Sequence, residues 1–199
     1  QKRGCRVEFG GRDLVQRHLD VGDRLRREGL PLTTRLVATN VGEAVHSLRE
    51  GSCDLILAYY DPDAAMQLTA DIFPSLHLGT TSMLPVCAVG PDGTPLYDVD
   101  SGQTVPLLAY SAGAFLGRSV NLLLRQRALR STTVYETAMA DSLKSMALQG
   151  LGIAWVPRLS VEPELERGEL AAQSADLLVQ HLDLCQRARR HTLLGLQRL

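Results

Sequence analysis

The sequence has little net charge, no long apolar run and no paired cysteine motif, and each absence removes a class of function. Its 21 basic and 22 acidic residues leave a formal net charge of −1 over 199 residues. This balance argues against direct binding of nucleic acid, which requires basic patches. No apolar run reaches the ~18 residues of a membrane-spanning helix, and no apolar signal segment opens the chain. We therefore expect a cytoplasmic protein with no membrane partner.

Metal, cofactor and catalytic motifs are missing as well. The five histidines show no metal-ligand spacing and the cysteines form no CxxC pair, so we expect no metal site. No GxSxG elbow, Walker loop or GxGxxG is present. We expect a chain that is not an enzyme and that takes no cofactor. The four cysteines fit buried reduced thiols; they are Cys5, Cys53, Cys87 and Cys185.

Strand and helix patterns alternate along the first half of the chain. A strand at residues 7–9 is followed by a helical pattern at 13–29 and a β-branched strand at 33–39. Asn40 caps a short helix that precedes the apolar strand at 54–60. This order predicts a parallel sheet that is covered on both faces.

A second series of elements follows a turn-rich passage at residues 90–106, which is itself preceded by two expected strands at 71–79 and 82–90. Together the two series predict two αβ lobes. The second series comprises strands at 107–110, 132–136 and 152–156, helices near 114–129 and 140–150, a short helical piece at 162–170 and a strand at 177–184.

The stretch "SMALQGLGIAWVP" changes from a helical to a strand pattern within two residues. Gly150 can adopt the left-handed conformation that ends a helix, and Gly152 allows a neighbouring backbone to pass close by. The apolar run that follows contains the single tryptophan, Trp155, and is typical of a buried strand. We interpret this strand as the return crossing between the two lobes.

The expected domain organisation follows from that interpretation. Lobe I contains residues 1–83 and 158–199, lobe II contains residues 90–151, and crossover strands lie at 84–89 and 152–157. Two lobes imply a cleft between them, and junctions of this kind are preferred ligand sites.

Three segments resemble the effector-binding domain of LysR-type transcriptional regulators: "SLREGSCDLILAYYD", "MLPVCAVGPDG" and "ALQGLGIAWVPRLSVEPELERGEL". They occur in the order and spacing of that family, over nearly the whole chain. Within the family, "LPVCA", "GRSVN" and "GIAWVP" are most similar to the hypochlorite-responsive branch. The chain departs from the family at "GGRD", where small hydroxyl residues are common, and at Asp20, where a proline often lies.

The resemblance implies an α/β, two-lobed, periplasmic-binding-protein-like (type 2) fold that receives a small-molecule or chemical signal in its cleft. It implies control of an N-terminal winged helix-turn-helix, which we expect to lie outside this chain, so DNA is contacted only through that missing domain. It also implies self-association as dimers, and as tetramers at full length, in which the first helix and second strand pack against a late helix of the partner. Apolar residues suited to that interface are Leu14, Val15, Leu19, Leu32 and Leu36.

Four helix starts converge on the expected cleft and would accept a small anion, because helix N-termini present free N–H groups and partial positive charge. Arg12 could add a bidentate clamp. Each of these residues could instead serve only as a helix cap or as a solvated side chain. The candidate effector-binding residues are Gly11, Arg12, Asp13, Thr39, Asn40, Tyr110, Ser111, Ala112, Thr137 and Met139.

Two other interpretations stay open. Met139 or Cys87 could sense an oxidant, since methionine oxidises to a polar sulfoxide; Leu116 stands where the hypochlorite-responsive relatives would hold a methionine. The chain could also be a free-standing solute-binding protein of the same fold. A small αβ enzyme would need a catalytic residue set that the sequence does not suggest.

Overall fold

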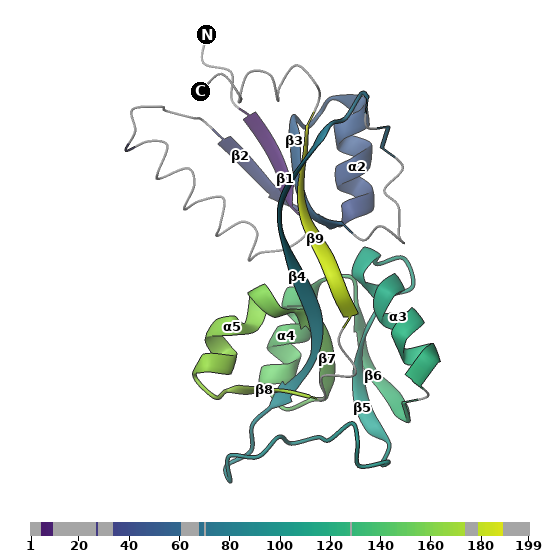
Figure 1. The fold of residues 1–199 in the computed structure, drawn as a ribbon, viewed down its shortest axis with the longest axis vertical. Helices are drawn as coiled ribbons and strands as arrows, with labels where there is room; N and C mark the ends of the chain where they lie inside the picture. The colour runs from purple at the N-terminus through teal and green to yellow at the C-terminus, as the bar shows by residue number, and fades with distance from the viewer. Residues whose placement is uncertain are drawn as a thin grey trace. The chain divides into compact units, whose positions relative to one another are not determined.

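The computed structural model describes residues 5–9, 27, 34–60, 68–69, 71–127, 129–173 and 179–188, which belong to two compact units (Figure 1). Unit 1 comprises residues 1–80 and 183–199, and unit 2 comprises residues 81–182. In chain order the elements are β1 (Cys5–Phe9), β2 (Thr34–Ala38), α2 (Val41–Glu50), β3 (Leu55–Tyr60), β4 (Ser75–Ala88), β5 (Val105–Tyr110), α3 (Phe115–Arg127), β6 (Ser131–Thr137), α4 (Ala140–Leu148), β7 (Ile153–Pro157), α5 (Arg158–Glu166), β8 (Leu170–Ala172) and β9 (Val179–Ala188).

Unit 1 contains a mixed sheet in the order β2-β1-β3-β9. β1 pairs in parallel with β2 and β3, and β9 pairs antiparallel with β3. The three strands expected in this part of the chain are therefore confirmed. The helix expected at 13–29 lies outside the described residues except for Arg27, which is helical.

Helix α2 begins and ends as its sequence predicts. The Asn40 side chain accepts a hydrogen bond from the Glu43 N–H at 2.9 Å, which satisfies a donor that the helix itself leaves open. Gly51 takes the left-handed conformation with φ of 81°, and its N–H donates to the Ser47 carbonyl at 3.0 Å. An L side chain at Gly51 would be strained in this conformation.

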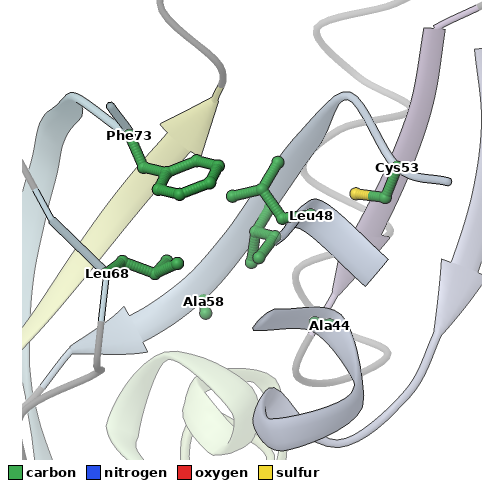
Figure 2. Close-up of a cluster of buried hydrophobic side chains, with 7 residues drawn as sticks. Ala44, Leu48, Cys53, Ala58, Leu68 and Phe73 are labelled. Carbon is green, nitrogen blue, oxygen red and sulfur yellow. The ribbon is translucent and has the colours of Figure 1, made fainter. Parts of the chain in front are cut away.

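The core of unit 1 lies between α2 and β3 (Figure 2). Leu48 is fully buried and points from α2 toward Phe73. The spacing of apolar residues along α2, three to four positions apart, thus directs one face of the helix onto the sheet. The cluster consists of Ala44, Leu48, Cys53, Ile56, Ala58, Leu68 and Phe73.

Unit 2 is built on strands in the order β4-β7-β5-β6, with β8 added on β4. The parallel strands β7 and β6 flank β5, whereas β4 pairs antiparallel with β7. Helices α4 and α5 lie on one side of these strands and α3 on the other (Figure 1). Every residue of β7 is buried, including Trp155 at 1% exposure. The expected strand with its tryptophan in the core is confirmed.

The boundary between the units differs from the expected one. The strand at 153–157 is not a return crossing; it pairs with β5 in parallel and with residues 83–86 of β4 inside unit 2. Helix α5 packs on β7 and β8, so residues 158–182 also belong to unit 2. The chain re-enters unit 1 at Asp183, within β9. A strand pattern indicates burial but does not identify the partner strand. For that reason the sequence placed the return of the chain to the first unit too early, at 152–157.

The two strands expected at 71–79 and 82–90 are one strand, β4. Its first eight residues are exposed or half-buried and its last six are buried. The polar stretch Thr80-Thr81-Ser82 is therefore a partly exposed section of the strand and not a turn. Thr is well suited to such exposed strand positions.

Helix α4 ends in a Schellman arrangement that explains the abrupt change from helix to strand. Gly150 has φ of 74°, its N–H donates to the Ala147 carbonyl at 2.9 Å, and the Leu151 N–H donates to the Met146 carbonyl at 3.2 Å. The following glycine, Gly152, has no room for a side chain, since a Cβ there would lie 2.6 Å from the Pro106 carbonyl oxygen. Both glycine predictions are confirmed.

Truncating Leu48 should test how strongly unit 1 depends on its core. We expect Leu48→Ala to lower the free energy of unfolding by about 2–5 kcal/mol, because it removes a fully buried side chain and leaves a cavity. The matched control is Leu78→Ala, an identical truncation at a side chain 46% exposed in the same unit, which should change it by less than about 0.5 kcal/mol. Urea denaturation followed by circular dichroism measures both. Equal effects of the two variants would contradict the assignment of this core.

Candidate functional site

The carboxyl ends of β5 and β6 lie side by side in unit 2. Tyr110, the last residue of β5, pairs with Thr137, the last residue of β6. Beyond the strands the pairing continues, because the Ser111 N–H donates to the Thr137 carbonyl at 2.9 Å. The starts of α3 and α4 follow directly. The five predicted residues of unit 2 are therefore brought to one edge of its sheet: Tyr110, Ser111, Ala112, Thr137 and Met139.

The turn before α3 differs from its predicted form. The helix begins at Phe115, so Ser111 lies too early to be its N-cap. Instead, the Ser111 carbonyl accepts the Ala114 N–H at 2.9 Å and closes a turn ahead of the helix. Ser111 is half-buried, whereas Ala112 is exposed. The turn of residues 111–114 thus has exposed residues in its middle, next to the strand end.

Thr137 and Met139 shape the start of α4. The Thr137 hydroxyl oxygen accepts the Met139 N–H at 3.3 Å, and its own hydrogen stays available to donate. Met139 occupies the N-cap position, and its half-buried side chain makes no capping hydrogen bond. A helix leaves its first N–H groups without intrahelical acceptors, so this end of α4 lacks the side-chain oxygen that usually satisfies one of them.

The charges near the two helix starts make them unequal as anion sites. α4 carries Asp141 in its first turn, whose carboxylate already offsets the positive end of the helix dipole. α3 has no acidic residue in its first turn. The start of α3 is therefore the more favourable place in unit 2 for a bound anion.

In unit 1 the predicted residues Thr39 and Asn40 follow β2 directly. The Thr39 hydroxyl donates to the Glu43 carboxylate, and the Asn40 side-chain oxygen caps α2, so the Asn40 amide nitrogen is the group left for a ligand. β1 ends at Phe9, which pairs with Ala38 at the end of β2. The other three predicted residues, Gly11, Arg12 and Asp13, lie outside the described residues.

The sequence did not reveal a buried ion pair that joins α4 to α5. The Lys144 ammonium lies 3.0 Å from the Glu164 carboxylate and donates to the Ser160 carbonyl at 2.7 Å. Arg167 extends the network, lying 3.5 Å from Glu164 and donating two 2.9 Å hydrogen bonds to Glu169. These side chains come from positions about twenty residues apart, and no local pattern signals such a pairing.

The chain's family follows from comparison with known proteins. The family model described as the LysR substrate binding domain matches residues 17–199, which is nearly the whole chain and includes both units. This chain belongs to the LysR substrate-binding domain family. Its fold is accordingly the two-lobed α/β fold of that family, as the resemblance implied, and the family is one of transcription regulators.

Curated relatives of this LysR domain are regulators from Escherichia coli. The HTH domain-truncated transcriptional regulator QseD of strain O157:H7 is 36% identical over 148 residues, or 74% of this chain and 59% of QseD. The HTH-type transcriptional regulator YjiE of strain K12 is 35% identical over 148 residues, 74% of this chain and 47% of YjiE. The matched part of the chain thus spans about half the length of these relatives.

Solved structures agree with the LysR assignment. The apo regulatory domain of HypT from Salmonella typhimurium has a TM-score of 0.81 and 26% identity, covering all of this chain and 96% of that one. Its bromide-bound form has a TM-score of 0.78 and 25% identity, covering all of this chain and 94% of that one.

Within the described ranges of this LysR domain, no three His, Cys, Asp or Glu side chains are placed to hold a metal ion. Of the helices that can be described, none has both the length and the apolar character needed to cross a bilayer. Within unit 2 the candidate site offers backbone N–H groups and the Ser111 and Thr137 hydroxyls, which suit a ligand bound by hydrogen bonds.

Cys87, the second predicted redox residue, lies in an environment that suppresses thiol reactivity. Its side chain is fully buried, and burial raises the pKa of the thiol more than hydrogen bonds with the backbone of Tyr97 and the side chain of Gln173 lower it. The thiolate is the reactive form. Cys87 is therefore held as a neutral thiol that packs between β4 and the loop containing Tyr97.

We predict that native Cys87 resists alkylation at neutral pH. Treatment with iodoacetamide followed by mass spectrometry should label it only after unfolding in urea. Its raised folded-state pKa also predicts that stability is undiminished below the unfolded thiol pKa of about 8.5 and falls as the pH rises above it. Rapid labelling of the native protein at pH 7 would contradict this account of the site.

Proposed function

We propose that this chain is the regulatory domain of a LysR-type transcription regulator. It binds a small effector, and the bound state controls DNA binding by a winged helix-turn-helix domain of the same polypeptide. Support comes from the family match over residues 17–199 and from the regulator names of its E. coli relatives. Since the matched region spans only 59% and 47% of those two relatives, the control of DNA is an inference about a longer protein.

The rival functions have less support. A transporter's solute-binding protein shares the fold class, but the curated relatives are regulators and not solute-binding proteins. An enzyme would need a nucleophile or an acid–base pair at the site. The edge of unit 2 holds instead backbone amides, the Thr137 hydroxyl and Met139. We accordingly propose a non-enzymatic, cytoplasmic sensor that needs no cofactor.

We propose a small anion as the effector, with its main contacts at the start of α3. The observation that carries this proposal is the absence of acidic residues from the first turn of α3, next to the exposed residue Ala112. An anion there would meet free N–H groups and the positive end of a 13-residue helix. The bromide-bound HypT regulatory domain is a related fold that takes a small anion.

Unit 1 carries predicted donors of its own. The Asn40 amide nitrogen is available at the end of β2, and the sequence places Arg12 just after β1, whose end pairs with that of β2. An arginine would add a charge-assisted hydrogen bond, which is worth about 1.5–3 kcal/mol. We expect Arg12 to make the strongest single side-chain contribution to anion affinity.

Oxidant sensing is the second candidate function, and Met139 is the residue that favours it. Its half-buried side chain sits at the N-cap of α4 without a capping hydrogen bond. Oxidation would place a sulfoxide oxygen, a hydrogen-bond acceptor, beside the open N–H groups of that helix. Full-length HypT is described as hypochlorite-specific, and a methionine-to-glutamine mutant of its regulatory domain has also been solved.

Self-association is part of the proposed function. Among the described strands, β2 in unit 1 and β6 in unit 2 stand at the ends of the strand order, and each has one row of backbone groups that no other described strand pairs with. Exposed apolar side chains lie on and near β6, at Val134, Tyr135 and, on α3, Leu122. Each of these surfaces by itself suits a two-fold interface between copies of the chain.

Changing the charge at Ala112 should separate anion binding from stability. Bromide binding is measured by calorimetric titration with sodium bromide at constant ionic strength. We expect bromide to bind the wild-type domain and to bind Ala112→Asp at least about tenfold more weakly, because the new carboxylate would repel an anion bound beside it. The same substitution should leave thermal stability without bromide unchanged or slightly raised, because an acidic group near a helix start is favourable. Ala112→Asn, of similar size and neutral, is the matched control and should bind within about twofold of wild type.

Two results of that titration would contradict the anion proposal. Bromide affinity that is the same in Ala112→Asp as in wild type would place the anion elsewhere. If bromide, carboxylates and phosphate all fail to bind, while hypochlorite oxidises Met139 selectively and changes assembly, oxidant sensing replaces anion binding. Arg12→Ala, with an expected tenfold to hundredfold loss of affinity, tests the contribution of unit 1 separately.

Assembly is tested by sedimentation equilibrium at micromolar concentration. We expect a dimer of twice 21.7 kDa for the wild-type domain, and a shift toward monomer for Leu122→Lys, which places a charge on the proposed interface. The matched control is Leu151→Lys, another exposed leucine of unit 2 outside that surface, which should stay dimeric. A wild-type protein that sediments only as monomer would refute the self-association proposal.

A further inference from the structure

Gly117 lies where α3 approaches the end of β5 most closely. A Cβ at this position would be 2.6 Å from the Tyr110 Cβ and 3.4 Å from the Ser111 carbonyl oxygen. Ordinary contacts between carbon atoms are about 3.5–4.0 Å. Glycine is unfavourable inside a helix relative to alanine, so a buried glycine in the first turn of α3 needs a packing reason. The approach to Tyr110 is that reason.

A side chain at Gly117 would displace α3 and not β5. β5 is held on both sides, by β7 and by β6. α3 packs mainly on β5 and carries the exposed Leu122 on its outer side. The helix is therefore the element that can give way, and relieving a 2.6 Å contact requires a movement of roughly 1 Å.

We infer that Gly117 is a positioning residue for the anion site, an inference that rests on the proposed function of the α3 start. By lacking a side chain, it lets the first turn of α3 lie directly against Tyr110 and so fixes the turn of residues 111–114. Ala114, the last residue of that turn, and Leu116, in the first turn of α3, are also buried. The N–H groups of this turn bind the anion only where that close approach places them.

A glycine that only allows packing would affect stability alone, whereas a positioning residue also changes affinity. The test compares Gly117→Ala with Val105→Ala. The second variant truncates a buried side chain at the amino end of β5, the end opposite to Tyr110. Both variants should lower the melting temperature. We expect only Gly117→Ala to weaken bromide binding, by roughly fivefold to tenfold, as for the loss of one hydrogen bond. Calorimetric titration well below both melting temperatures measures this, with trimethylamine N-oxide added if a variant needs it to stay folded.

Amide resonances give a readout that does not depend on bromide. Gly117→Ala should move the NMR signals of Ser111 and Ala112 and speed hydrogen exchange at the Ser111 N–H, which bonds to Thr137; Val105→Ala should not. Unchanged resonances, or equal loss of bromide affinity in both variants, would overturn the inference. If wild type fails to bind bromide while the resonances move, the anion proposal fails but the positioning of this turn by Gly117 stands.

Discussion

The parallel pairing of β5 with its two neighbours is the constraint on which the candidate site depends. β5 pairs with β6 through Tyr110 and Thr137 at their carboxyl ends, and with β7 through Leu107 and Leu108. Parallel strands that end together must release their helices at the same edge of the sheet. The starts of α3 and α4 are neighbours for that reason, and the hydrogen bond from Ser111 to Thr137 continues the pairing beyond the last strand residues.

Close backbone contacts on either side of β5 make this arrangement sensitive to single atoms. Gly152 lies against the Pro106 carbonyl at the amino end of β5, and Gly117 lies against Tyr110 at its carboxyl end. Packed interiors have few voids, so one added carbon at either contact must move an element. On the opposite side, the Lys144–Glu164 pair ties α4 to α5 in a partly buried setting. Lys144 lies in the middle of α4, so the pair connects that part of the helix to α5.

Elements whose signals are local could be predicted from the sequence. The Asn40 cap and the left-handed Gly150 were each predicted from a few adjacent residues, because capping and left-handed turns depend on the local backbone. The residues that gather at the end of β5 and β6 were also predicted, since a strand–helix order fixes which strand ends meet. The resemblance to LysR regulators added the family, which the comparisons confirm.

Features that depend on distant parts of the chain could not be predicted in the same way. The strand at 153–157 has the composition of any buried strand, and only its pairing with β5 places it inside unit 2. The polar stretch within β4 suggested a break between two strands, because polar residues are common both in turns and at exposed strand positions. Gly117 gave the weak signal of a glycine within a helical pattern, but the atom it must avoid belongs to Tyr110, seven residues earlier.

A small anion at the start of α3 would be visible directly in a crystal of this domain. Anomalous diffraction at the bromine edge, from crystals of this domain grown with sodium bromide, locates the anion directly. We expect a bromide peak within hydrogen-bonding reach of the N–H groups between Ala112 and Gly117. A domain that binds bromide in solution but places every peak away from this turn would contradict it.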